Sequence, residues 1–327
     1  MDALKLLENL VKIHSPSKGE RKIVEYLLKL LDDRDPLVYE RDDIINIVIN
    51  PESDVWVVTH VDTVSVKRDF EFDGRYAYGT GVCDAKANVA AIVLALSEIE
   101  KLNIGIALLS DEEEDGLGSK FLVEEFKPRK AIVLEPTDLK IAKRNYGSLE
   151  IIVDVRGLSA HGSTPEFGIN AIEKAIELIK KIKDLGCEFS VQEISGGSSE
   201  YVIPDKCRFR IDFTIPPDKS VDEIEQRVLG VLEGFRYDVV EKSDGFISGE
   251  VCEILERALR FTGMDIEYCE MKSWTDAINL KNAGWDVVVF GPGELHLCHT
   301  ERERIKIEDV IKTRDVIKAL NEVVEEE

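Results

Sequence analysis

The chain has 327 residues, of which 44% are hydrophobic, enough for one large domain or two moderate ones. Its 65 acidic residues outnumber its 42 basic ones, and a surface with a formal net charge of −23 repels nucleic acid and anionic lipid. No apolar run reaches the length of a membrane span, and the amphipathic N-terminus is not expected to be a signal peptide. The six cysteines form no CxxC pair, so we expect reduced thiols in a cytoplasmic protein.

The first part of the chain alternates between helical and strand patterns. Apolar residues at helical spacing predict helices, and short runs rich in β-branched residues predict strands. Two helices, two strands, a helix and two more strands are expected in that order, at 2–13, 21–31, 45–50, 54–60, 88–102, 104–110 and 130–135. This order predicts an α/β sheet with helices on its faces.

The pattern changes at Gly147 and returns after Gly245. Between them the expected order is strand, helix, strand, strand, helix, strand, at 148–157, 168–185, 187–194, 207–215, 220–234 and 236–242. This is the split β-α-β, or ferredoxin-like, arrangement. Helices at 249–263, 275–284 and 307–324 and a buried strand at 285–293 then complete the first pattern. We therefore expect a small α+β domain at 147–245, inserted into an α/β domain made of residues 1–146 and 246–327.

Acidic and imidazole side chains follow the predicted strands at the edge where open α/β sheets place their sites. These residues are His60, Asp62, Asp84, Asp111, Glu112, Glu113, Glu114, Glu135 and His299. Each alone would fit a polar cap or a solvated loop. Four adjacent acids directly after a buried strand, however, repel one another without a counter-ion. Since imidazole and carboxylate are the ligands of zinc, cobalt or manganese, the pattern predicts a metal site.

Five motifs resemble, in order, those of the di-zinc aminoacylase and carboxypeptidase family: HVDTV, GTGVCDAK, SDEEEDGLGS, LEPT and CHTERE. Acetylornithine deacetylase and succinyl-diaminopimelate desuccinylase belong to that family. The resemblance covers nearly the whole chain, including RGLSAHGSTP in the inserted domain. It implies a mixed-sheet α/β metallohydrolase domain, an inserted ferredoxin-like lid and dimerisation domain, and a homodimer.

The resemblance also implies two divalent metal ions, zinc by preference and cobalt or manganese as alternatives. Their ligands would be His60, Asp84, Glu113, Glu135 and His299. Asp84 would bridge the metals, with His60 and Glu135 on one and Glu113 and His299 on the other. The remaining roles fall to three catalytic residues: Asp62, Glu112 and His161. The first would orient the His60 imidazole, the second would be the general base, and the third would donate to the oxyanion from a second subunit.

Two points within this assignment stay open. A slip of one residue would make Glu113 the base and Glu114 the ligand. His296 is a rival of His299 for the last metal position.

The expected reaction is hydrolysis of the amide bond of a small N-acyl amino acid by metal-activated water. A hydrolase of carrier-linked lysine or ornithine, a dipeptidase or carboxypeptidase, and a non-catalytic metal-binding module are alternatives. The net charge weighs against an acidic carrier unless a local basic patch intervenes. Departures from the family pattern at Thr80, Ala87, Tyr201 and Thr214 leave the acyl group open.

Enzymes of two other classes are disfavoured. The GTGVCD segment lacks the third glycine of a dinucleotide-binding loop, and Asp84 stands in its place. The GxSxG elbow of a serine hydrolase does not occur.

Overall fold

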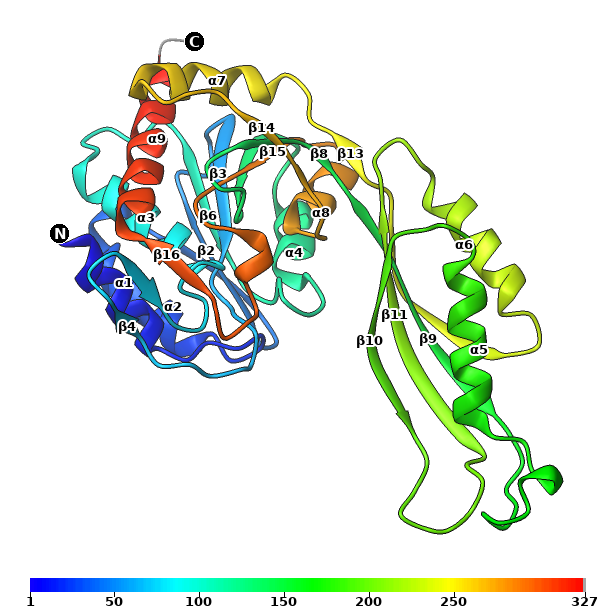
Figure 1. Cartoon of the computed structure of the whole chain (residues 1–327). Helices are drawn as coiled ribbons and strands as arrows, with labels where there is room; N and C mark the ends of the chain where they lie inside the picture. Colours follow the sequence, from blue (N-terminus) through cyan, green and yellow to red (C-terminus); the bar gives the residue numbers. More distant parts are fainter. Residues whose placement is uncertain (326–327) are drawn as a thin grey trace. The chain divides into compact units, whose positions relative to one another are not determined.

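The computed structural model describes residues 1–325, and the chain divides into two compact units (Figure 1). The first unit contains Met1–Lys143, Ser248–Met271 and the segment that begins at Thr275. The second contains Arg144–Ile247 and Lys272–Trp274. The second unit is therefore made of one long insertion and one short segment of the chain.

A mixed sheet forms the middle of the first unit, in the order β1-β2-β6-β3-β7-β15-β8-β13, with β14 paired to β8. Its strands are β1 (Leu37–Arg41), β2 (Ile44–Ile49), β3 (Val55–His60), β6 (Gly105–Leu109), β7 (Lys130–Leu134), β8 (Ile141–Asn145), β13 (Phe246–Ile247), β14 (Tyr268–Met271) and β15 (Asp286–Phe290). The neighbours β6, β3, β7 and β15 run parallel, whereas the pairs β1-β2, β2-β6 and β8-β15 are antiparallel. The expected mixed α/β fold is confirmed.

Helices cover both faces of this sheet, which explains why β2, β3 and β6 are buried along their whole length. On one side lie α1 (Ala3–Lys12), α2 (Arg21–Leu30), α3 (Lys86–Glu98), α7 (Val251–Thr262) and α9 (Ile307–Glu325), which share one apolar core. On the other lie α4 (Leu117–Glu125) and α8 (Asp276–Asn282), which contact each other. Helix α3 is apolar on all sides because it runs between the sheet and α1 and α9.

A second, small sheet of the first unit joins distant segments in the order β16-β5-β4. Its strands are β4 (Glu71–Phe72), β5 (Tyr76–Tyr78) and β16 (Arg304–Lys306). It ties the loop after β3 to the chain that follows His299.

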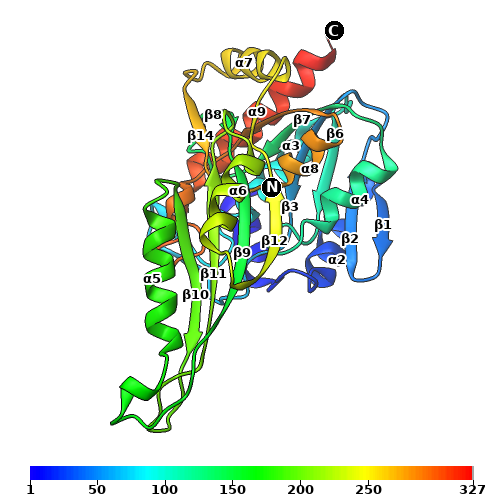
Figure 2. The same ribbon diagram turned by 90° about the vertical axis from the view of Figure 1, so that its right-hand side faces the viewer.

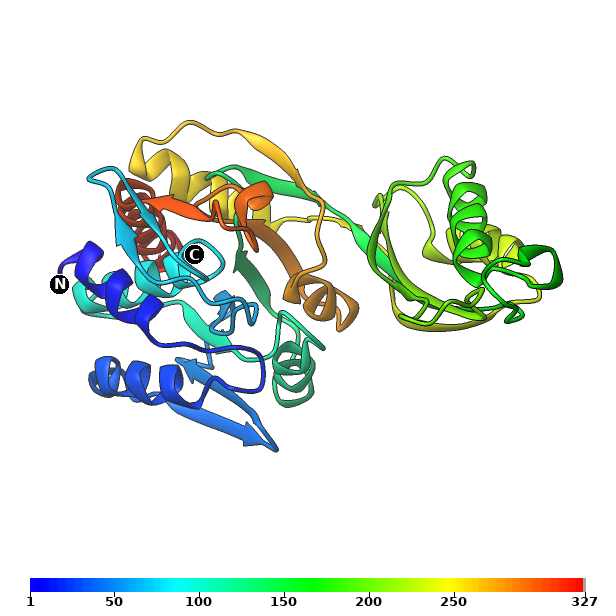
Figure 3. The ribbon, with the colours of Figure 1, turned by 60° about the horizontal axis from the view of Figure 1, so that its bottom comes forward.

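The second unit is an antiparallel sheet in the order β10-β11-β9-β12 (Figure 2). Its elements are β9 (Gly147–Arg156), α5 (Ala171–Lys183), β10 (Phe189–Gly196), β11 (Lys206–Ile215), α6 (Val221–Val231) and β12 (Arg236–Ser243). Figure 3 shows both helices on one side of the sheet. Every second residue of β11 is buried against them, so the predicted ferredoxin-like order forms with one apolar face.

The structure differs from the sequence-based expectation in the short strands. Strands β1 and β8 were not predicted, because LVYER and IAKRN are short and polar and depend on pairing with a buried neighbour. The strand predicted to end at Gly293 ends at Phe290. Pro292 lacks an amide hydrogen for the ladder, and Gly293 adopts a φ of +94°, so the chain turns there. Among residues 1–325, no helix has the length and apolarity of a membrane span.

Candidate metal centre

The predicted site residues of the first unit gather at one edge of its sheet. His60 is the last residue of β3, the acidic run follows β6, and Glu135 follows β7 directly. Since these strands are parallel neighbours, their carboxyl ends meet. Asp84 precedes α3, and His299 lies in the loop between β15 and β16.

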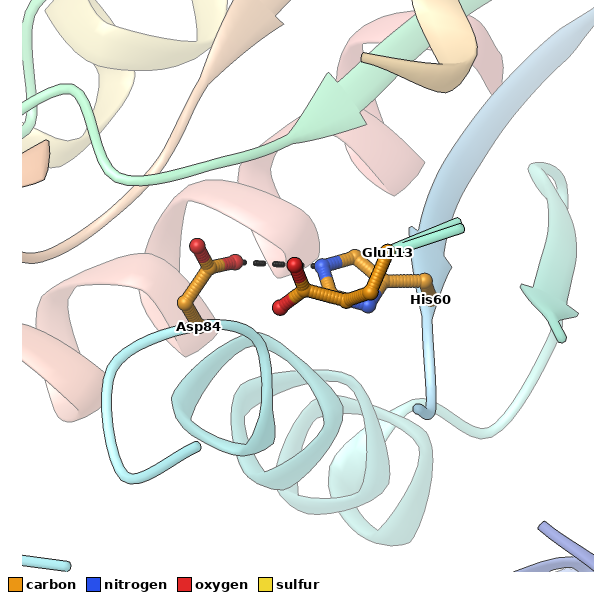
Figure 4. Close-up of side chains that lie close together, drawn as sticks. All are labelled: His60, Asp84 and Glu113. Atoms are coloured by element: carbon orange, nitrogen blue, oxygen red, sulfur yellow. Dashed lines mark hydrogen bonds and ion pairs between the residues drawn. The ribbon is translucent and has the colours of Figure 1, made fainter. Parts of the chain in front are cut away.

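Asp84 lies between the two imidazoles. Its Oδ1 is 3.1 Å from His60 Nε2, and its Oδ2 is 3.4 Å from His299 Nε2. Glu113 Oε1 is 2.9 Å from the same His299 nitrogen. The potential ligand atoms of His60, Asp84 and Glu113 all lie within 4.8 Å of one another, and Figure 4 shows these side chains pointing together.

Two further carboxylates face His60. Its Nε2 is 3.9 Å from Glu112 Oε2 and 4.0 Å from Glu135 Oε2. These contacts are longer than hydrogen bonds, and Glu135 Oε1 is buried without any hydrogen-bond partner. A buried acceptor in this position needs a hydrogen-bond donor, a proton or a cation as its partner.

Asp62 fixes the other side of the His60 ring. His60 Nδ1 lies 3.1 Å from the carbonyl oxygen and 3.3 Å from Oδ1 of Asp62, so Nδ1 donates. In a neutral His60 ring, Nε2 then carries the lone pair, and it faces the cluster. The Asp62 carboxylate also accepts from the backbone amides of Glu112 at 3.1 Å and Glu113 at 3.0 Å. One aspartate therefore orients both an imidazole and the acidic loop.

The crowding of buried charged groups raises the pKa values of several side chains in the cluster. Burial, reinforced by the charges of Glu135 and Glu113 although opposed by His60, raises the pKa of Glu112 well above its ordinary range. Burial and the nearby Asp84 do the same to the pKa of Glu135, against the effect of His60. Burial lowers the pKa of His299, but its contacts with Asp84 and Glu113 outweigh burial and raise that pKa to about 11. Divalent cations could replace these protons, since imidazole nitrogens and carboxylate oxygens are suitable donors.

The rest of the acidic run points elsewhere. Glu114 is exposed and lies 3.2 Å from Lys18 Nζ, which also contacts Asp115 at 2.6 Å. Asp111 is buried, 3.7 Å from the same ammonium group. These three acids share one lysine as their partner, away from the imidazoles.

Both remaining histidines named from the sequence are exposed. His296 lies in the short helix η3 (Leu295–Leu297). His161 belongs to the second unit, where its Nδ1 accepts a hydrogen bond from the backbone amide of Ser163 at 3.3 Å. Its ring stands edge-on to Tyr201, with 5.4 Å between ring centroids.

Three buried acids near the cluster were missed by the sequence analysis: Glu20, Asp276 and Glu303. Glu303 accepts hydrogen bonds from the backbone amides of Gly81, Cys83 and Asp84. It belongs to the CHTERE motif, in which the sequence analysis assigned a role only to His299. Ser119 donates to one oxygen of Asp276, whose other oxygen has no partner, and burial raises the pKa of this acid to about 7. No local pattern singles out Glu20 or Asp276.

Comparisons with known proteins agree with this architecture. Residues 142–235 match a family described as a peptidase dimerisation domain. The chain is 29% identical to a Pyrobaculum aerophilum protein provisionally named LysW-lysine/LysW-ornithine hydrolase, with 100% of this chain and 98% of that protein covered. It is 28% identical to acetylornithine deacetylase of Myxococcus xanthus over 76% of this chain and 72% of that enzyme. An M20 family metallo-carboxypeptidase from Sulfolobus solfataricus has a similar fold, with a TM-score of 0.78, 17% identity and 99% of both chains covered. The resemblance inferred from the five motifs is confirmed.

Proposed function

We propose that this chain, a relative of the M20 metallopeptidases and a hydrolase of amide bonds, removes the acyl group from the amino nitrogen of an amino acid with the help of two divalent metal ions. The observation that carries the proposal is the position of Asp84. Its two oxygens face different imidazoles, at 3.1 Å and 3.4 Å, as a carboxylate that bridges two cations must.

The contacts divide the ligands into two sets around Asp84. His60 and Glu135 would hold one ion, and Glu113 and His299 the other, with Asp84 shared. Zinc, cobalt and manganese all suit these donors. Bound there, such ions would polarise the amide carbonyl and lower the pKa of a water molecule.

Glu112 is the proposed general base. Its Oε2 lies 3.9 Å from His60 Nε2, which is longer than a hydrogen bond, so its carboxylate is available for proton transfer. It would take the proton of the attacking water and deliver it to the departing amine nitrogen. Glu113 contacts His299 and Glu114 contacts Lys18, which supports Glu112 and Glu113 as base and ligand over the register one residue later.

The second unit is the proposed dimerisation domain and lid. It contains all but the first two residues of the matched dimerisation segment. Large apolar side chains are exposed at its surface: Leu158, Phe167, Ile169, Tyr201 and Val202. Exposed apolar side chains of this size favour burial against a second copy. Because Ser163 donates to His161 Nδ1, the proton of a neutral His161 ring is on Nε2, where it could be donated to an oxyanion.

The similar enzymes suggest two classes of substrate for this reaction. Acetylornithine deacetylase is one similar enzyme, so small N-acyl amino acids of the acetylornithine or succinyl-diaminopimelate type are candidates. The hydrolase of LysW-linked lysine or ornithine aligns with the whole chain, which favours an amino acid linked to a larger acyl partner.

The test is hydrolysis by the metal-reconstituted protein. Chain stripped of metal and reloaded with zinc or cobalt is assayed on N-acetylornithine, N-succinyl-diaminopimelate, dipeptides and lysine in amide linkage to a glutamate side chain. We expect turnover of at least one N-acyl amino acid that depends on added metal. No turnover above that of the Glu112→Gln variant on any of them would refute the proposed function.

A further inference from the structure

Two reduced cysteines from distant parts of the chain meet beside the metal centre. Cys83 Sγ and Cys298 Sγ are 3.5 Å apart, although 215 residues separate them in the sequence. Cys83 is fully buried and Cys298 is 7% exposed. Since two bonded sulfurs lie about 2.05 Å apart, a movement of about 1.5 Å would allow this pair to form a disulfide.

Local packing holds each of these thiols toward the other. Cys83 Sγ lies against the turn that follows β15, 3.8 Å from the carbonyl oxygen of Pro292. A Cβ on Gly293 would come within 2.1 Å of this sulfur, so the glycine leaves the room that the thiol occupies. Cys298 Sγ lies 3.6 Å from the carbonyl oxygen of Glu294. Both sulfurs therefore lie where the loop before α3 contacts the loop between β15 and β16.

Each cysteine directly precedes a proposed metal ligand. Asp84 follows Cys83, and His299 follows Cys298. The ligand atoms Asp84 Oδ2 and His299 Nε2 are 3.4 Å apart. Metal sites tolerate changes of only about 0.2 Å in their ligand distances, far less than the movement that the two sulfurs need. A disulfide would therefore pull on the backbone of both ligands and distort the site.

We infer that Cys83 and Cys298 are a site of reversible oxidation, at which a disulfide weakens metal binding and reduction restores it. The oxidant is hydrogen peroxide, which is small enough to reach a thiol that is almost buried. The consequence for the metal centre rests on the proposed function, whereas the formation of the disulfide does not.

The reaction consumes one molecule of hydrogen peroxide. Because Cys298 is the more exposed thiol, its sulfur attacks a peroxide oxygen, the O–O bond breaks, and Cys298 becomes a sulfenic acid as water leaves. The sulfur of Cys83 then attacks the sulfur of Cys298, and the S–O bond breaks. The departing hydroxide takes the proton of the Cys83 thiol and leaves as a second water. Two thiols thus lose two electrons and two protons, which dithiothreitol can return as it becomes a disulfide itself.

Peptide mapping of the oxidised protein tests the site itself. The full chain is reduced, freed of reductant and treated with hydrogen peroxide, and linked peptides are identified by mass spectrometry. We expect a Cys83–Cys298 link in the parent and in Cys207→Ala, a control that also removes a buried thiol, from the core of the second unit. In Cys298→Ala, Cys83 should stay unlinked. Peroxide-treated parent without this link overturns the inference, whether or not the variants fold.

Metal affinity tests the consequence of the link. Zinc affinity is measured by competition with a chelator on the reduced parent, on the oxidised parent, and after treatment with dithiothreitol that is then removed. Oxidation should lower the affinity at least about tenfold, as loss of a group that supports a ligand does, and reduction should restore it. Peroxide should change the affinity of Cys298→Ala by less than about twofold, which excludes damage at other residues. Equal affinity of the linked and reduced parent contradicts the inference.

These measurements are independent of hydrolysis. If no amide is hydrolysed but oxidation links the cysteines and weakens zinc binding, the inference stands and the proposed function falls. If amides are hydrolysed but oxidation leaves zinc affinity unchanged, the inference alone falls.

Discussion

The backbone amide of Asp84 donates a 3.2 Å hydrogen bond to the buried carboxylate of Glu303. The same carboxylate accepts from the amides of Cys83 at 3.0 Å and Gly81 at 3.2 Å. Because Glu303 follows His299 by four residues, one segment supplies an imidazole of the cluster and also supports the loop that carries its central aspartate.

Replacement of Glu303 should loosen that loop. Glu303→Ala leaves three buried amides without an acceptor, so we expect metal affinity to fall about 10- to 100-fold while the fold is retained. Glu303→Gln keeps one acceptor oxygen and should lie between the two. The measurement is zinc affinity by competition with a chelator, and Glu301→Ala, at an exposed neighbour, is the control. Parent-like affinity in Glu303→Ala would show that the hydrogen bonds do not position Asp84.

Glu112→Gln should abolish turnover and keep the metals. The amide keeps the size of the side chain but cannot accept and return a proton, so kcat should fall by at least about 10²–10⁴. Metal content by mass spectrometry should match that of the parent. Glu114→Gln, at the exposed end of the same run, should keep nearly full activity. The reverse pattern, an inactive Glu114→Gln beside an active Glu112→Gln, would favour the later register.

The two neighbouring histidines should differ in their effect on metal binding. His299 contacts Asp84 and Glu113, whereas His296 lies in η3 and forms no ion pair with either acid. Zinc at about 100 times its dissociation constant should stabilise the parent by about 2.7 kcal/mol, seen as a rise in Tm. His299→Ala should lose most of this rise and His296→Ala should keep it. An equal rise in both variants would exclude His299 as a ligand.

Glu20 should make stability depend on pH. Burial, together with the charge of Asp62, raises the pKa of Glu20 from 4.5 to about 7. The folded state therefore binds a proton more tightly than the unfolded state, and folding loses stability as pH rises from about 4.5 to about 7. Glu20→Gln cannot titrate and keeps an oxygen for the Asp111 amide, so it should gain up to roughly 3 kcal/mol over the parent at pH 8, and little at pH 4.5. The Tm difference between variant and parent is measured across this range, with Glu25→Gln on the exposed face of α2 as the control. A difference that does not change with pH would contradict the raised pKa.

His161 should act across the dimer. His161→Ala and Glu112→Gln are each expected to be nearly inactive as homodimers. If each site combines its own Glu112 with the partner subunit's His161, mixed dimers contain one complete site, and random exchange should restore about a quarter of parental activity. Activity is measured after the two variants are mixed and allowed to exchange subunits. No recovery, with subunit exchange shown by native mass spectrometry, would place His161 within its own subunit or outside the reaction.

Much of the fold could be predicted because local periodicity reports burial. The helices over Ala3–Lys12 and Ala171–Lys183 bury one stripe each, and the apolar runs of β3 and β6 are covered on both faces. Strands β1 and β8 carried no such signal, since their pairing depends on neighbours supplied by the tertiary structure.

The sequence by itself determined the candidate ligands, because side chains such as His60 and Glu135, which follow parallel strands, reach one edge of a sheet, and because the five motifs implied Asp84, Glu113 and His299. Only the tertiary structure decided their partners: that Glu113 contacts His299 while Glu114 contacts Lys18, and that Glu303 supports Asp84. It also decided that the sulfur atoms of Cys83 and Cys298 lie 3.5 Å apart. The physical reason is that such contacts join segments far apart in the chain, where electrostatic energy depends on distances of a few ångströms that no local pattern encodes.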